Sequence, residues 1–424
     1  MKRYMAVKML VVGTALLFTM LLPAQSVAYM SGAEELCLQF VEQKLQSEGG
    51  VFTNYLPLKE DTDWAAGHSV LSESQGLMLS YYTQTKNKAM AQNVIAFVQD
   101  HLDTGSILSY RLEEDGRVYK VNAAVDDLRL IRAMLEGQDA FQLPDIHDQA
   151  ILYAKRLYDT NVRNQVLVDF FDDQYKQAGG YATLCYSDFY TMNIISAYDK
   201  RWLQVMENMR ELVMDGYLGD AFPFFDTRYN LEKQCYESEN VPMVESLLTA
   251  YHLSKADSCP IQTVEYIKKA LQRGKLYSIY DLSGTPLTDR ESTAIYALCA
   301  LIGASEYDAE LYSAAIERML PFQVMDEKSP VYGAFADAQT LQAYSFDNLM
   351  ALLALDAGKV FSQAVSFSSS RERCRCENAS FDNGNDCFAG AAVLCSGCRA
   401  ARSAGIPAGK RASVHYECFN RLRV

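Results

Sequence analysis

Apolar side chains recur at helical spacing along most of this chain. From residue 33 to about residue 356 they return every three or four positions, which places them on one face of a helix. Ala124, Leu128, Ile131 and Leu135 form one such face. The pattern predicts mostly amphipathic helices of similar length over residues 33–47, 70–84, 87–103, 124–137, 144–160, 185–197, 199–215, 240–255, 261–274, 290–303, 307–320 and 340–356.

The linkers between these helices alternate in length. Some are short, as at residues 84–88 and 198–201. The others are long and rich in glycine, aromatic and acidic residues, and cover residues 50–69, 104–123, 161–184, 216–239, 275–289 and 321–339. The alternation predicts six helix pairs closed into a ring, an all-α (α/α)6 barrel or six-hairpin toroid. A superhelical array of helix pairs is the alternative, but we see no residue motif repeated at a fixed period.

Two of the long linkers carry turn signals. Glu114-Asp115-Gly116 and Ser283-Gly284 are each flanked by short apolar stretches. Such sequences are typical of tight turns between antiparallel strands. We therefore expect small β-hairpins in the long loops. The long loops would gather at one end of the barrel, and functional residues concentrate on loops that a rigid scaffold holds in place.

The first 28 residues have the pattern of a secretion signal. Lys2, Arg3 and Lys8 precede an apolar stretch over residues 9–22, and Ser26-Val27-Ala28 supplies small residues for cleavage. The apolar stretch is short for a membrane span. We expect cleavage near Ala28, a secreted or extracellular product, and no membrane span afterwards. An uncleaved anchor is the alternative, and a lipoprotein is disfavoured because no cysteine lies at the cleavage point.

The helical pattern stops after about Gly358, so we predict a barrel domain over 29–358 and a separate tail over 359–424. The tail is rich in arginine and contains Cys374, Cys376, Cys387, Cys395, Cys398 and Cys418. These spacings lack the paired pattern of a zinc site. A small disulfide or metal module and a disordered tail are two interpretations. We favour a third, translation in the wrong frame after a nucleotide insertion or deletion, and assign the tail no function.

Composition and charge exclude some classes of function. The chain has 424 residues, is 49% hydrophobic, and carries a formal net charge of −14 with a pI of about 4.9. An acidic protein without a basic region is a poor ligand for nucleic acid. The five histidines are isolated, and the sequence contains no His-Glu-x-x-His, Gly-x-Ser-x-Gly or glycine-rich phosphate loop. We expect no metal and no cofactor, and an oligosaccharide or polysaccharide stays possible as the substrate.

Acidic residues open two of the predicted helices. Ser72 with Gln75 fits a capping box, which would make Glu73 the first helical residue. Asp126 and Asp127 lie in the first turn of another helix, and they point about 100° apart, so only one is expected to face a given cleft. Such acids also complement the helix dipole, which is the alternative explanation. A general acid needs a raised pKa, and burial beside a second carboxylate would supply it.

Three short stretches resemble glycoside hydrolase family 8. Ser72-Glu73-Ser74-Gln75-Gly76, followed by Met78, resembles the family's Ser-Glu-Gly-Gln-x-x-Gly-Met acid motif. Ala123-Ala124-Val125-Asp126-Asp127-Leu128 resembles its Ala-Ser/Thr-Asp-Ala/Gly-Asp-Leu signature, with Val125 in place of the first aspartate. Tyr236-Glu237-Ser238-Glu239-Asn240-Val241-Pro242 is similar to its Tyr-Asp-Ala-x-Arg-x-Pro stretch. The departures fit a divergent member or a neighbouring (α/α)6 family such as glycoside hydrolase family 126.

The resemblance implies an inverting hydrolysis of a glycosidic bond. In that mechanism one carboxylic acid protonates the leaving oxygen and a carboxylate on the opposite face of the sugar activates water. Glu73 would be the acid and Glu237 the base. Asp127 would bind and distort the sugar at the cleavage point. Asp226 is the rival base, with a loop aspartate paired to Arg228 as the alternative explanation.

Further side chains are candidates for binding the sugar. Aromatic rings stack on the flat C–H faces of sugars, and Trp64 lies beside Asp63 in the long loop before Glu73. Tyr190 opens another predicted helix, although tyrosines at helical spacing often belong to the core. The substrate-binding candidates are Trp64, Asp63, Asp126, Asp188, Tyr190 and Asp226.

Together these features predict a secreted glycoside hydrolase that cleaves a glucan-like polysaccharide or exopolysaccharide. One alternative is a non-catalytic carbohydrate-binding protein that keeps the barrel and has lost the base. Another is a helical toroid lyase acting on an acidic polysaccharide, which the charge of −14 disfavours.

Overall fold

The computed structural model describes residues 24–47, 50–57 and 68–359. All of them fall in one compact unit that extends to Phe361. Residues 1–23, Asp63, Trp64 and the tail from residue 360 onward lie outside the described residues. Within the described ranges no helix is both long enough and apolar enough to cross a membrane.

The described chain is mostly helical, as the apolar pattern predicts. Short 3-10 or π segments extend three of the helices: η1 (Val41–Leu45), η2 (Val98–Leu102) and η4 (Leu320–Phe322). The helices are α2 (Ala24–Phe40), α3 (Ser72–Gln84), α4 (Lys88–Phe97), α5 (Ala124–Phe141), α6 (Pro144–Asn161), α7 (Phe189–Ile195), α8 (Arg201–Asp215), α9 (Met243–Lys255), α10 (Ile261–Arg273), α11 (Thr293–Ser305), α12 (Ala309–Met319) and a last helix over 345–359.

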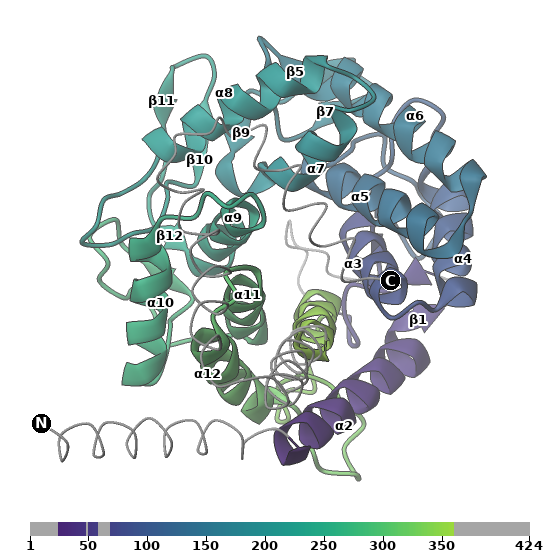
Figure 1. Cartoon of the computed structure of the whole chain (residues 1–424). Helices are drawn as coiled ribbons and strands as arrows, with labels where there is room; N and C mark the ends of the chain where they lie inside the picture. The colour runs from purple at the N-terminus through teal and green to yellow at the C-terminus, as the bar shows by residue number, and fades with distance from the viewer. Residues whose placement is uncertain (1–23, 48–49, 58–67, 360–424) are drawn as a thin grey trace, which may run out of the picture. The chain divides into compact units, whose positions relative to one another are not determined.

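The helices lie in two layers (Figure 1). The inner layer contains α3, α5, α7, α9, α11 and the helix 345–359, and the outer layer contains α2, α4, α6, α8, α10 and α12. The sequence explains the division. From Thr293 to Gly303, α11 is apolar or small on every side and fully buried, whereas α10 buries only one stripe. An evenly apolar helix must be surrounded by other helices, and a striped one can face water.

Short antiparallel strands connect neighbouring long loops. β3 (Val70–Leu71) pairs with β4 (Arg111–Leu112), β9 (Tyr181–Thr183) with β10 (Arg228–Asn230), and β12 (Val241–Pro242) with β13 (Ile279–Tyr280). Each of these loops leads into an inner helix. These pairings hydrogen-bond the loop before α3 to the loop before α5, the loop before α7 to the loop before α9, and the loop before α9 to the loop before α11.

Local hairpins also form in the loops, as predicted. The predicted turns occur at Gly116 and Gly284, which have φ values of 83° and 88°. Bridges Leu112↔Val118 and Tyr280↔Pro286 flank them, but the longer pairings of β4 and β13 are with the preceding loops. The remaining hairpins are β1 (Gln46–Ser47) with β2 (Gly50–Val51), β5 (Val162–Arg163) with β6 (Val166–Leu167), β7 (Phe171–Asp172) with β8 (Gln177–Ala178), and β10 with β11 (Cys235–Tyr236).

The first and last described segments contact each other. Tyr55 N donates to the carbonyl oxygen of Ala343 at 2.9 Å, and the Ser74 and Ser345 hydroxyls are 2.8 Å apart. At the other end of the last helix, Lys359 Nζ lies 2.5 Å from the Glu34 carboxylate. These contacts join α2 and α3 to the helix 345–359.

Candidate active site

Glu73 and Asp126 lie in the first turns of two inner helices that pack side by side, α3 and α5. The β3–β4 pairing holds the two helix starts level. In addition, Ser72 N donates to the carbonyl oxygen of Tyr110 at 3.0 Å. The long loops therefore bring together two acids that are 53 residues apart in the sequence.

Ser72 does not cap α3, so the capping-box interpretation is wrong. The N-cap position is occupied by Leu71, and Ser72 is already helical. The Ser72 hydroxyl instead donates to Asp126 Oδ2 at 3.1 Å. Gln75 turns away to bond the backbone of Val51, with its amide nitrogen 3.3 Å from the carbonyl oxygen. Tertiary partners on α5 and β2 have replaced the local cap.

The environment of Glu73 suits a proton donor. Its side chain is partly buried. Burial and the charge of the Asp126 carboxylate raise the pKa of Glu73 to about 7, and Arg129 opposes that rise. Arg129 Nη1 lies 2.6 Å from Asp126 Oδ1, and Asp126 is buried. Burial raises the pKa of Asp126 as well, while Arg129 and Ser72 lower it.

Asp127 faces away from this pair. Its carboxylate accepts a hydrogen bond from Asn122 Nδ2 at 2.7 Å, and it lines a small cavity with Asn122, Tyr153 and Thr160. Tyr153 and Thr160 belong to α6, in the outer layer. Burial raises the pKa of Asp127 well above its usual value. Of the two adjacent aspartates, Asp126 is therefore the one beside Glu73.

A short 3-10 turn, η3 (Leu184–Tyr186), contacts both α5 and α9. Two further acids, Asp169 and Glu245, lie near this turn. Burial, then Cys185, Asp126, Asp169 and Glu73, raise the pKa of Tyr186 well above its usual value. Burial, Glu245 and Asp169 do the same to the pKa of the Cys185 thiol. The turn therefore lies near the acids at the starts of α3, α5 and α9 and near Asp169.

Asp169 is held in place from several sides. Thr183 N and Thr183 Oγ1 donate to its two carboxylate oxygens at 2.6 and 2.8 Å. Its carbonyl oxygen accepts from Ala124 N, the first residue of α5, at 2.8 Å. Burial raises the pKa of Asp169 to about 6, against the lowering effect of Thr183 and Arg228. Burial and Asp169 also raise the pKa of Glu245, in the first turn of α9.

Glu237 lies on the β10–β11 hairpin, where other side chains bind it. Lys233 Nζ is 2.8 Å and Asn230 Nδ2 is 3.1 Å from Glu237 Oε1. The hydrogen bond from Lys233 lowers the pKa of Glu237. Asp226 lines a small cavity together with Glu245, and its backbone N–H donates to Gly216.

Asp188 and Tyr190 belong to the packing of α7. Asp188 caps this helix, accepting from Thr191 N and Thr191 Oγ1, and Arg132 lies 3.0 Å from it. Burial alone would raise the pKa of Asp188, but Arg132 and His252 lower it to about 2. The Tyr190 ring lies 4.4 Å from the Lys255 ammonium. Asp188 is fully buried, so it supports the helix starts from inside.

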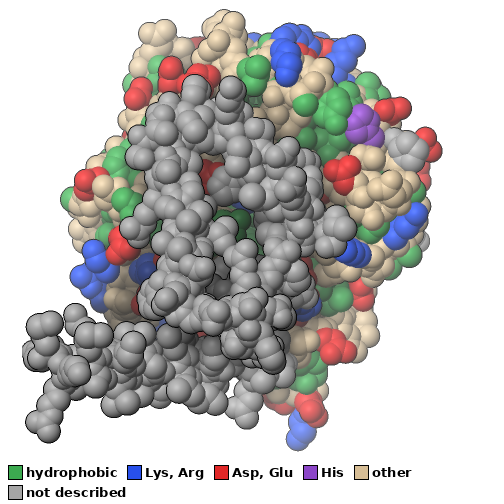
Figure 2. Space-filling model, in the orientation of Figure 1, with side chains coloured by type: hydrophobic (Ala, Val, Ile, Leu, Met, Phe, Trp, Pro, Cys, Tyr) green, Lys and Arg blue, Asp and Glu red, His purple; other side chains and the backbone are tan. Residues whose placement is uncertain are grey.

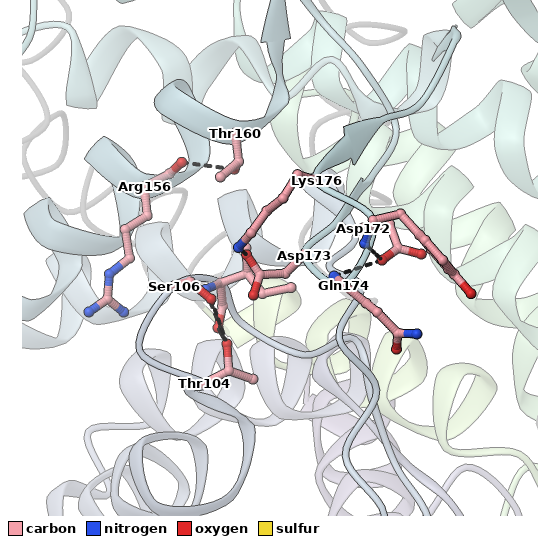
Figure 3. A network of polar contacts seen from close by, with 10 residues as sticks. Thr104, Ser106, Arg156, Thr160, Asp172, Asp173, Gln174 and Lys176 are labelled. Atoms are coloured by element: carbon pink, nitrogen blue, oxygen red, sulfur yellow. Dashed lines mark hydrogen bonds and ion pairs between the residues drawn. The ribbon is translucent and has the colours of Figure 1, made fainter.

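Polar contacts join the long loop that precedes α5 to the long loop that precedes α7 (Figure 3). Lys176 Nζ lies 2.6 Å from Asp173 Oδ1, and Figure 3 shows this pair beside Ser106 of the preceding long loop. Asp173 N also donates to the carbonyl oxygen of Lys120 at 2.7 Å. On the face shown in Figure 2, acidic and basic side chains are interspersed over the visible described surface.

Asp169, Arg129 and Glu245 lie near the candidate site but are not among the residues predicted from the sequence. Glu245 had a usable signal, because it lies in the first turn of a predicted helix, as Glu73 does. Asp169 had a weaker one, a single acid between Val168 and Phe170 in an otherwise apolar stretch. Among the residues that the structure describes, no three or more His, Cys, Asp or Glu side chains are grouped to hold a metal ion.

Known proteins share this architecture. No protein-family model matches the chain. A protein of Bacillus subtilis (strain 168) named "Putative lipoprotein YdaJ" is 24% identical over 297 residues, 69% of this chain and 80% of that protein. The solved structure of a novel alpha-amylase from Clostridium perfringens is 31% identical, with a TM-score of 0.72, and the match covers 77% of this chain and 97% of that one.

Family 8 enzymes have the same fold. Endoglucanase Cel10 from Klebsiella pneumoniae, a family 8 glycosyl hydrolase, has a TM-score of 0.51 at 13% identity, over 68% of this chain and 97% of its own. The sequence identity of 31% to the Clostridium protein, over 77% of this chain, shows a common family as well as a common fold. This chain therefore belongs to the six-hairpin glycosidases that resemble glycoside hydrolase family 8, and it is a glycosidase.

Proposed function

We propose that this protein is a secreted glycoside hydrolase that cleaves a glucan-like polysaccharide with inversion, and that Glu73 is its general acid. The observation that carries the proposal is the position of Glu73 at the start of α3, next to the buried Asp126–Arg129 pair at the start of α5. Burial and the Asp126 carboxylate raise the pKa of Glu73 there to about 7. A carboxyl group that keeps its proton near neutral pH can give it to a leaving oxygen.

Asp126 takes the role that the sequence resemblance gave to Asp127. Arg129 and the Ser72 hydroxyl hold its carboxylate beside Glu73, so it can bind sugar hydroxyls next to the bond that breaks. Its negative charge also favours the protonated form of Glu73. Asp127 does not contact the substrate in this scheme. It accepts a hydrogen bond from Asn122 and so positions the loop before α5.

The names of two similar solved structures support a glucan as the substrate. The Clostridium protein is described as an alpha-amylase and the Klebsiella protein as an endoglucanase, so both names refer to glucans while the linkages differ. Secretion is supported by the signal-like first 28 residues and by the name of the Bacillus relative. We infer that the domain spans residues 29–358.

We also infer that the helix pairs close into an (α/α)6 barrel. The bonds between residues 54–55 and 343–344, and between Ser74 and Ser345, support closure, since they join the first inner helix to the last. In a closed barrel the starts of all inner helices surround one groove.

The test is release of reducing sugar from soluble starch, glycogen, carboxymethylcellulose and mixed-linkage β-glucan. We expect the parent to hydrolyse one of these, and Glu73→Gln to lower kcat by roughly 10²- to 10⁴-fold, the usual contribution of a general acid. The matched control is Glu310→Gln, a first-turn glutamate of the outer helix α12 whose side chain is 68% exposed. Binding of these glucans without hydrolysis by the parent would instead favour a carbohydrate-binding protein.

A further inference from the structure

We propose that Asp169, and not Glu237, is the catalytic base that takes the proton from the attacking water. This inference rests on the proposed inverting hydrolysis and names the second carboxyl group that the reaction requires.

Asp169 is tied to the helix that carries Asp126. Its carbonyl oxygen accepts from Ala124 N at 2.8 Å, two residues before Asp126. Asp169 N in turn donates to the carbonyl oxygen of Tyr181 at 3.0 Å, which binds it to β9. The backbone of Asp169 therefore lies between the start of α5 and β9. Tyr186 of η3 lies near enough to both Asp169 and Glu73 for the two carboxyl groups to raise its pKa.

Inversion sets the spacing that the two carboxyl groups must have. A base in an inverting glycosidase lies about 6.5–9.5 Å from the acid, far enough to admit a water and the anomeric carbon. Asp169 is not the carboxylate directly beside Glu73, because Asp126 takes that position and Asp169 is bound by Thr183.

Thr183 orients the Asp169 carboxylate and leaves it able to accept a hydrogen bond from water. One donor from Thr183 reaches each oxygen, at 2.6 and 2.8 Å. A carboxylate offers about four lone-pair positions, so two stay available for water. The side chain is partly exposed, and donors of this kind favour the charged form that a base needs. Thr183 is a positioning residue in this scheme.

Two of the rival acids are bound by other side chains, whereas Asp226 lines a small cavity together with Glu245. Glu237 binds Lys233 and Asn230 on an exposed hairpin. Asp188 is fully buried and holds Thr191 and Arg132. Around Asp169 itself the charged and titratable groups are Glu245 from α9, Arg228 from β10, and Cys185 and Tyr186 from η3.

The step balances without any further reactant. The water oxygen bonds to the anomeric carbon while its proton passes to Asp169. The bond from that carbon to the glycosidic oxygen breaks, its electron pair stays on the oxygen, and the oxygen takes the proton of Glu73. The product has the opposite anomeric configuration, and solvent returns one proton to Glu73 and removes one from Asp169.

The decisive experiment is chemical rescue of Asp169→Gly with sodium azide. The substrate is a 2,4-dinitrophenyl oligoglucoside with the linkage that the parent hydrolyses. We expect Asp169→Gly to lose roughly 10²- to 10⁴-fold in kcat. Azide should restore activity and yield a glycosyl azide of inverted configuration, because an anion needs no base. Circular dichroism and the melting temperature check that the variant is folded.

Comparison variants separate the possible failures. Glu73→Gln should lose activity on the polysaccharide but keep much of it on the dinitrophenyl substrate, whose leaving group needs no proton. Thr183→Val removes one donor, so it should move the acidic limb of the pH profile to higher pH. Full activity of Asp169→Gly, or azide rescue of Glu237→Gly instead, overturns the assignment of Asp169. An inactive parent overturns the proposed function as well.

Discussion

At the level of single residues, burial and partners decide what each carboxyl group of this protein can do. Glu73 has a pKa of about 7 because it is buried beside Asp126. Asp188 has a pKa of about 2 because Arg132 and His252 outweigh the effect of its burial. Both residues open inner helices, so the helix dipole alone does not distinguish them. Their neighbours raise the pKa of one carboxyl group and lower that of the other.

The pH dependence of activity follows from two of these values. A general acid must be protonated and a base ionised, so activity requires a pH below the pKa of Glu73 and above that of Asp169. With values of about 7 and about 6, we expect a bell-shaped profile of kcat/KM with its maximum between them. Glu73→Gln, assayed on the dinitrophenyl substrate, should lose the alkaline limb. A parent whose activity stays constant up to pH 9 would contradict the role of Glu73.

Stability should respond to pH through the same residue. The pKa of Glu73 is raised on folding, from an ordinary value of 4.5 to about 7. The folded state therefore binds the proton more tightly, and this contribution to stability is complete below pH 4.5 and is lost as the pH rises through 7. Melting temperatures measured from pH 4.5 to 8 should fall less in Glu73→Gln than in the parent, since glutamine does not titrate.

At the level of elements, glycine sets how closely two helices approach. Gly303, near the end of α11, packs against the start of α12. A Cβ at this position would lie 2.7 Å from Tyr312 N and 3.0 Å from Tyr312 Cα. These are backbone atoms, so the neighbouring helix would have to shift. The α11–α12 pair therefore depends on a residue without a side chain.

Gly303→Ala should destabilise the protein by about 1–3 kcal/mol, the usual cost of overpacking a core. The measurement is urea unfolding followed by circular dichroism. The matched control is Gly32→Ala on α2, where an added Cβ meets nothing within 4 Å. Alanine is a better helix former than glycine, so the control should gain about 0.5–1 kcal/mol. Equal effects of the two substitutions would contradict the close approach of α11 and α12.

At the level of the whole molecule, buried polar contacts join the beginning of the described chain to its end. Glu34 on α2 is buried, and it receives both the Tyr81 hydroxyl at 2.8 Å and the Lys359 ammonium at 2.5 Å. Asp356 lies 3.7 Å from the same ammonium. One carboxylate thus connects α2, α3 and the helix 345–359.

Glu34→Gln should lower the free energy of unfolding by about 1–3 kcal/mol, because it leaves a charge-assisted bond unmade in a buried place. The control is Glu310→Gln, which breaks an exposed pair with Lys268 and should change stability by less than about 0.5 kcal/mol. Both are measured by urea unfolding at pH 7. An effect of Glu34→Gln as small as that of the control would show that these ends are not held by this carboxylate.

The sequence by itself determined the helices and their pairing. Apolar spacing located most of them to within a few residues, as in 261–274 against Ile261–Arg273, because helical periodicity is a local property. The first helix is an exception, since α2 begins at Ala24 and the pattern predicted residue 33. Alternating linker lengths showed which helices lead into long loops. The stretch around Glu73 was also recognisable, since a short motif at a helix start needs no distant partner to be read.

Only the tertiary structure decided which acids meet. Asp126 and Asp127 are equivalent in the sequence, but the packing of α5 between α3 and α6 turns one toward Glu73 and the other toward Tyr153. Asp169 reaches the site through hydrogen bonds between loops, to Ala124 and Tyr181. Burial and charge–charge distances are properties of the folded chain, and they set the pKa values on which the chemistry depends.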